Sequence, residues 1–148
     1  MLTELPESLL DAELPLVQGQ SVKLADYAGK VVVLNFFATY CEPCKVEAQE
    51  LSKLYEEFSS QGVVVIVLSI ENPVMSSVAV RDWFYSSQLP YLAGWATSDF
   101  AAAFMGQETI PQTFVITRKS QILKQLLGYL PTTMGELTAA VKQAIESS

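Results

Sequence analysis

Hydrophobic residues follow two different spacings along the chain, and the change of spacing predicts strands and helices. Unbroken runs of β-branched and aromatic residues occupy 31–37 and 63–68, and such runs are typical of strands buried on both faces of a parallel or mixed sheet. Between the runs, apolar side chains recur at the spacing of one helix face, with charged residues opposite. The residues predicted to form this buried face are Val46, Leu51, Leu54, Tyr55 and Phe58. This region therefore predicts a strand, a helix and a second strand.

Weaker patterns predict further elements on both sides of this unit. They are, in chain order, two short strands at 14–17 and 21–24 around a glycine turn, a helix at 76–88, a short helix from a cap at Ser98–Asp99 to Phe104, a hairpin of 113–117 and 122–127, and a last helix opened by a capping box from Thr133 to Glu136. Strands that alternate with helices predict an α/β sandwich. We expect one domain over residues 1–148, in which residues 1–13 form a flexible start.

Composition excludes several classes of protein. The chain has 148 residues, of which 50% are hydrophobic and 17% charged. A chain of this length buries roughly 70% of its unfolded surface, so we expect a folded domain and not a disordered chain. The net charge is −7, from 9 Lys and Arg against 16 Asp and Glu, which argues against nucleic-acid binding because few cations are available to neutralise phosphates. No apolar run approaches the ~20 residues that span a membrane.

The two cysteines, Cys41 and Cys44, lie at the predicted junction between a buried strand and the following helix. Unpaired backbone N–H groups give a helix N-terminus a partial positive charge, which favours a thiolate over a thiol. We therefore expect Cys41 to be the attacking sulfur, exposed at the turn. Cys44, one turn into the helix, would be more buried and would resolve the mixed disulfide. Pro43 would stiffen the turn between them.

A structural disulfide and half of a zinc site are the other uses of this cysteine spacing. A tetrahedral zinc site needs four ligands, and the chain has no further cysteine and no histidine. The absence of histidine also removes Ser–His and Cys–His nucleophile pairs. A disulfide that closes a four-residue loop contributes little stability through loop entropy. We therefore interpret the pair as redox-active, and expect neither a metal nor another cofactor.

Two further positions are candidates for the same chemistry. Glu47 follows Cys44 by three residues, so on a helix it lies one turn along on the same side. There it could be partly buried below the disulfide and act as proton acceptor or donor, although the spacing fits a solvated charge equally well. Ile110–Pro111 precedes a predicted strand, either as an ordinary strand-entry proline or as a cis peptide in a tight turn.

Residues 35–47 and 110–116, which contain these motifs, resemble the TlpA/ResA-like branch of the thioredoxin superfamily. The resemblance extends over roughly residues 14–146. It implies a thioredoxin fold, a three-layer α/β/α sandwich with a mixed central sheet, an extra N-terminal β-hairpin and an inserted helical segment between 68 and 91. It also implies that Cys41 is nucleophilic, that Cys44 resolves, and that Pro111 is cis beside them.

The resemblance also suggests roles for neighbouring residues. Asn35 stands where thioredoxin proper has a buried aspartate, and a glutamate at the place of Glu47 handles the proton in this branch. The backbone of Ile110 would pair with the substrate as an added strand. Phe37 and Tyr40 stand where the family usually has tryptophan, which leaves partner specificity open. The residues expected to contact substrate are Tyr40, Glu42, Pro43, Ile110 and Pro111.

The function implied by the resemblance is that of a thiol–disulfide oxidoreductase that reduces protein disulfides. The setting would be cytochrome c maturation or extracytoplasmic redox homeostasis, with an upstream thiol protein as electron donor. We expect the bacterial periplasm or the outer face of the cytoplasmic membrane, with a leader outside this sequence, and the cytoplasm as the alternative. A disulfide oxidase or isomerase stays open, because Glu42–Pro43 does not set the reduction potential. A Cu(I) metallochaperone is an alternative of another class, since two thiolates suit Cu(I).

Overall fold

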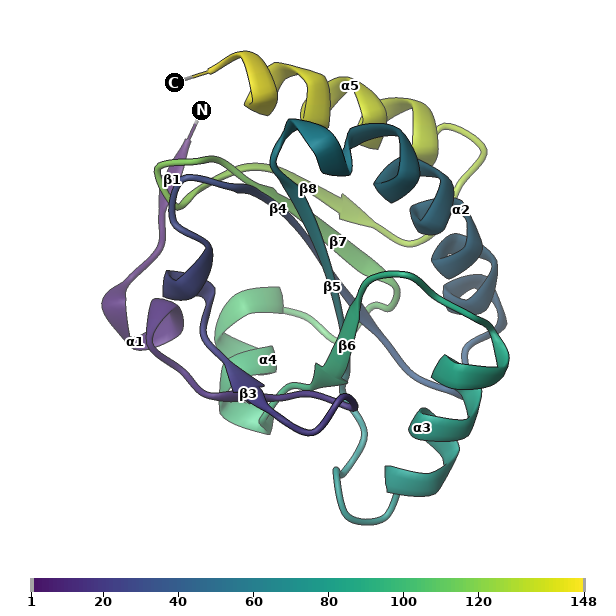
Figure 1. Cartoon of the computed structure of the whole chain (residues 1–148). Coiled ribbons are helices and arrows are strands. Elements are labelled where there is room, and N and C mark those ends of the chain that lie inside the picture. Colours follow the sequence, from purple (N-terminus) through teal and green to yellow (C-terminus); the bar gives the residue numbers. More distant parts are fainter. Residues whose placement is uncertain (1, 148) are drawn as a thin grey trace.

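A six-stranded mixed sheet with helices on both faces forms the centre of the computed structural model, which describes residues 2–147 (Figure 1). The strands are β1 (Thr3–Glu4), β2 (Leu14–Pro15), β3 (Ser21–Val22), β4 (Val31–Phe37), β5 (Val63–Ser69), β6 (Leu92–Trp95), β7 (Gln112–Ile116) and β8 (Gln121–Leu127). The helices are α1 (Glu7–Leu10), α2 (Glu42–Phe58), α3 (Ser77–Ser86), α4 (Ser98–Met105) and α5 (Thr133–Glu146), with 3₁₀ turns at Leu24–Tyr27 and Ser59–Gln61. The strand order in the sheet is β1-β8-β7-β4-β5-β6, while β2 and β3 form a separate hairpin.

Strand β4 divides the hydrophobic core into two layers. Its residues alternate between the faces, with Val31, Val33 and Phe37 in the cluster that includes α2, α3 and α5. On the opposite face, Phe36 belongs to the cluster that contains α4 and the N-terminal hairpin. All seven residues of β4 are buried, so the prediction of a strand buried on both faces is confirmed, and so is the three-layer α/β sandwich with a mixed sheet.

The strand register determines where the ends of β4 and β7 meet. Strand β4 runs parallel to β5 and antiparallel to β7, and Phe36 pairs with Gln112. Phe37 ends β4 and leads to the turn before α2, while Pro111 immediately precedes β7. The residues just after β4 and just before β7 therefore lie together at one edge of the sheet.

The N-terminal segment and β6 differ from the sequence-based expectations. Residues 1–13 were expected to be flexible, but β1 pairs with β8 and Leu5 is buried in the core. Strand β6, which was not predicted, pairs in parallel with β5. Its alanine and glycine have low strand propensity, so its conformation depends on its partners, which are β5 on one edge and Leu16, bridged to Gly94, on the other. The β6 region is tied to α2 by the Tyr91 hydroxyl, which donates to the Ala48 carbonyl at 2.8 Å.

Two local details, one in α2 and one in α4, were also predicted wrongly. Val46 is 51% exposed, and Glu47 occupies the buried face of α2 that the prediction gave to Val46. Helix α4 is capped by Thr97, whose hydroxyl accepts from the Phe100 N–H, and not by Ser98–Asp99.

The capping box predicted at the start of α5 does not form. The N-cap is Thr132, and the Thr133 hydroxyl accepts a hydrogen bond from the Leu130 N–H outside the helix. Glu136 instead pairs with Lys124 at 3.7 Å. None of the helices within residues 2–147 is both long and apolar enough to cross a membrane.

Candidate active site

Cys41 and Cys44 form a disulfide at the N-terminus of α2. Cys41 is the N-cap residue, and its Sγ accepts a hydrogen bond from the Cys44 N–H at 3.3 Å. In the reduced protein, the same N–H group and the positive end of the helix would stabilise a thiolate on Cys41. Pro43 lies in the first turn of the helix between them.

The exposure of the two cysteines corrects one detail of the sequence interpretation. Cys41, expected to be exposed, is only 9% exposed and belongs to the hydrophobic cluster that includes α2. Cys44 is 1% exposed. Cys41 is therefore the more accessible of the two sulfurs, which is the order expected for an attacking and a resolving cysteine.

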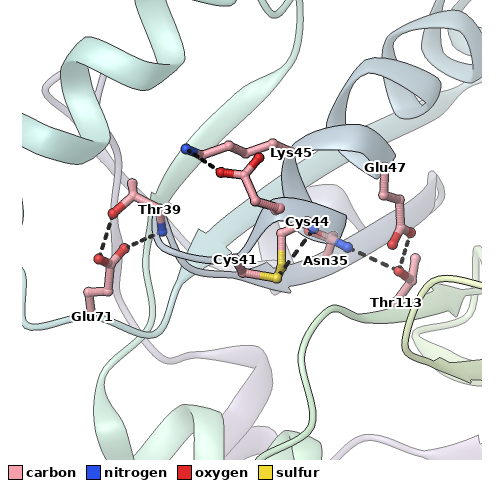
Figure 2. Close-up of a disulfide and its surroundings, with 9 residues drawn as sticks. Asn35, Thr39, Cys41, Cys44, Lys45, Glu47, Glu71 and Thr113 are labelled. Carbon is pink, nitrogen blue, oxygen red and sulfur yellow. Dashed lines mark hydrogen bonds and ion pairs between the residues drawn. A yellow bond between two sulfur atoms is a disulfide. The ribbon is translucent and has the colours of Figure 1, made fainter.

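Glu47 is completely buried one helical turn beyond Cys44. Its Oε2 accepts a hydrogen bond of 2.6 Å from the Thr113 hydroxyl, which accepts in turn from the Asn35 amide at 3.0 Å (Figure 2). Within residues 2–147, its Oε1 has no hydrogen-bond partner. Burial raises the pKa of Glu47 to about 7, and the hydrogen bond from Thr113 opposes part of that rise. The carboxyl group can therefore take up or release a proton near neutral pH, and the alternative of a solvated helix charge is wrong.

Glu71, which the sequence interpretation did not select, holds the turn before Cys41. Its Oε1 accepts from the Thr39 N–H at 2.9 Å and from the Ser69 hydroxyl at 2.8 Å, and its Oε2 accepts from the Thr39 hydroxyl at 2.7 Å. Figure 2 shows Glu71 and Glu47 on opposite sides of the disulfide. No local spacing signals this contact, because the parallel pairing of Phe37 with Ser69 brings the two segments together.

The residues expected to contact substrate surround Cys41. Tyr40 is 72% exposed, and the exposed carboxylate of Glu42 pairs with Lys45 at 3.6 Å. The Ile110–Pro111 peptide bond is cis, and Pro111 is buried. Within residues 2–147, neither the N–H nor the carbonyl of Ile110 makes a hydrogen bond.

No group of three His, Cys, Asp or Glu side chains in the described part of the chain is placed to hold a metal ion. The reduced thiols of Cys41 and Cys44 are the pair that a soft cation such as Cu(I) would meet at this site.

Sequence comparisons relate the chain to redox proteins. A model of the AhpC/TSA family matches residues 6–125. The thiol-disulfide oxidoreductase ResA of Bacillus subtilis is 29% identical over 116 residues, covering 78% of this chain and 63% of the relative. The ResA of Halalkalibacterium halodurans is 31% identical over 120 residues, covering 81% of this chain and 66% of the relative. The chain thus spans slightly less than two thirds of the length of these curated relatives.

Structural comparisons establish a thioredoxin-like fold. The thiol:disulfide interchange protein, a thioredoxin family protein from Chlorobium tepidum TLS, superposes with a TM-score of 0.80 at 23% identity, covering 98% of this chain and 97% of that one. Peroxiredoxin Q of Xanthomonas campestris superposes with a TM-score of 0.75 at 18% identity, covering 97% and 98%. The fold expected from the sequence is therefore confirmed.

Proposed function

Because the chain belongs to the AhpC/TSA family and is a TlpA/ResA-like member of the thioredoxin superfamily, we propose that it is a thiol–disulfide oxidoreductase that reduces disulfides in other proteins. The observation that carries this proposal is the Cys41–Cys44 disulfide at the start of α2, where the Cys44 N–H points at the Cys41 sulfur. The relatives named thiol-disulfide oxidoreductase support it.

The reaction begins with the reduced pair. The Cys41 thiolate attacks one sulfur of a substrate disulfide, so that the substrate S–S bond breaks and a mixed disulfide forms. Cys44 then loses its proton and attacks the Cys41 sulfur, which closes the Cys41–Cys44 bond and releases the substrate as a dithiol. Two electrons pass to the substrate, and of the two protons that the product dithiol carries, one derives from Cys44 and the other from solvent. We assign Glu47 as the group that accepts the Cys44 proton, since its pKa is about 7 and it lies one turn away.

Substrate binding follows from the position of Ile110. Its N–H and carbonyl, which have no partner within residues 2–147, can hydrogen-bond to an extended substrate segment, which would add a strand beside Cys41. We expect Tyr40, Glu42 and Pro43, which adjoin Cys41 in the chain, and Pro111, which immediately precedes β7, to contact the substrate as well.

The family resemblance suggests the setting of this reaction. We place it outside the bacterial cytoplasm, in cytochrome c maturation or general redox homeostasis, with a separate thiol protein that reduces the Cys41–Cys44 disulfide after each turnover.

The reduction potential of the pair tests the direction of electron flow. The protein is equilibrated with thiol–disulfide buffers of defined potential, and the alkylated thiols are counted by mass spectrometry. A reductase should have a value near or below that of thioredoxin, about −270 mV, while a value at or above that of protein disulfide isomerase, about −180 mV, would identify an oxidase or isomerase.

Single cysteine variants test the assignment of the two sulfurs. Cys44→Ser should accumulate a mixed disulfide between Cys41 and a substrate, because the resolving thiol is missing. Cys41→Ser should show neither turnover nor a trapped intermediate. Turnover in Cys41→Ser would contradict the proposed mechanism.

A further inference from the structure

A groove of about 580 Å³ is lined by residues of the turn before Cys41, of the segment before Pro111 and of α4. Tyr40 and Ile110 contribute to its wall, and these residues immediately precede Cys41 and Pro111. Ile70, just after β5, forms another part of the wall, and α4 closes the remaining side. The lining thus combines the residues that immediately precede Cys41 and Pro111 with residues of α4.

The shape and chemistry of the groove favour an apolar side chain. Helix α4 contributes the short side chains of Ala101 and Ala102 to the lining, together with Met105 and, at its start, Ser98. Ile70 and Ile110 are half-buried, so part of their apolar surface faces the open space. Small-molecule pockets typically have volumes of roughly 300–1,000 Å³, so a groove of this size accommodates a bulky side chain and its neighbours.

The charge at the groove favours a cation next to that side chain. Glu108 is exposed and lines the groove, and no lysine or arginine lines it. The net charge of the chain is −7. A positively charged residue of a partner would therefore be attracted to this rim, whereas an acidic residue would be repelled.

We propose that this groove selects protein substrates that present the target cysteine in an extended segment. In that segment a bulky apolar residue lies two positions from the cysteine, and a lysine or arginine lies two positions beyond it. The inference rests on the proposed function. Ile110 offers its N–H and carbonyl, unpaired in the described part of the chain, to an extended segment, and alternate side chains of such a segment point to the same side. A residue two positions from the cysteine therefore lies about 7 Å further along on the same side of the segment, and in this proposal its side chain enters the groove.

Four synthetic peptides test this selection. Each carries one cysteine as a mixed disulfide with thionitrobenzoate, with leucine or glycine two positions from the cysteine, and lysine or glutamate two positions beyond that. The reduced protein releases thionitrobenzoate when Cys41 attacks the peptide sulfur, and the absorbance change gives the second-order rate constant. We expect the leucine–lysine peptide to react at least tenfold faster than the glycine–glutamate peptide.

Variants on α4 locate the selection in the groove. Ala102→Phe fills it and should remove the preference for leucine, while Ala103→Phe is the matched control, since Ala103 is exposed on the same helix and does not line the groove. Glu108→Lys should reverse the preference between lysine and glutamate. Equal rates for all four peptides, or equal effects of the two phenylalanine variants, would overturn the proposal.

A small disulfide distinguishes this proposal from the proposed function. Dithiobis-nitrobenzoate does not need the groove, so its reduction by the wild type tests the oxidoreductase function alone. If the wild type reduces this compound but does not discriminate among the peptides, the groove proposal alone is wrong. If the wild type does not reduce it, the oxidoreductase function itself is wrong.

Discussion

Replacing Glu47 with glutamine is expected to make the oxidised protein more stable at neutral pH. The carboxyl group is completely buried, and burial raises its pKa from 4.5 to about 7. Between these two values the unfolded chain releases the proton while the folded protein keeps it. A rise in pH therefore favours the unfolded state, because that state binds fewer protons.

The size of this effect follows from the pKa difference. The shift of about 2.5 units, from 4.5 to about 7, corresponds to about 3 kcal/mol at 1.36 kcal/mol per unit. Relative to high pH, the proton that the folded protein holds on Glu47 contributes this stability in full below pH 4.5, and the contribution is lost as the pH rises through 7. Glutamine has a similar size, can still accept from the Thr113 hydroxyl and carries no charge. Glu47→Gln should therefore avoid the loss.

Urea unfolding of the oxidised protein at several pH values from 4.5 to 8 measures the effect as a difference between wild type and variant. The chain has no histidine, so no histidine titration overlaps this range. Thr113→Val provides a second variant with the opposite expectation. It removes the hydrogen bond that lowers the Glu47 pKa, so the pH-dependent loss should become larger than in the wild type. If the wild type and Glu47→Gln show the same pH dependence, the reasoning about Glu47 is wrong.

Two further substitutions test other parts of the structure. Glu71→Ala removes the acceptor for Thr39 and Ser69. At roughly 1 kcal/mol for each hydrogen bond, we expect the variant to be less stable in urea and to release thionitrobenzoate more slowly. Glu57→Ala, at an exposed position, is the control and should change neither. Phe36→Ala empties a buried site between the rings of three phenylalanines and should cost about 3–5 kcal/mol; a loss below 1 kcal/mol in urea unfolding would contradict this packing.

The sequence predicted elements whose signals are local and failed where the signal depends on distant neighbours. β4 and β5 are long apolar runs, and their burial follows from that pattern. β6 has four residues and includes Ala93 and Gly94, so its pairing with β5 is the dominant cause of its conformation. The exposure of Val46 has a similar reason: single exposed apolar residues are common on protein surfaces, so residue type alone could not show which face of α2 is buried.

The candidate site likewise combines a residue that local spacing identifies with contacts that only the strand register explains. Glu47 was found from the sequence because it lies on the same helix as Cys44, and helical spacing is local. Its full burial was not predictable from that spacing, because it depends on Thr113 and Asn35, which β7 and β4 supply. Glu71 is thirty residues from Cys41, and only the register of β4 and β5 brings it to Thr39.

The two carboxylates flank one disulfide but differ in what surrounds them. Glu71 accepts three hydrogen bonds and joins the end of β5 to the turn before Cys41, so its contacts suit it to holding the attacking sulfur in place. Glu47 accepts one, and among the described residues its other, buried oxygen has no partner, so its surroundings suit it to exchanging a proton. A change at Glu71 should therefore alter the rate at which Cys41 reacts at every pH, whereas a change at Glu47 should alter the pH range in which Cys44 reacts. Proton transfer and positioning of the nucleophile are thus assigned to different elements on opposite sides of the Cys41–Cys44 bond.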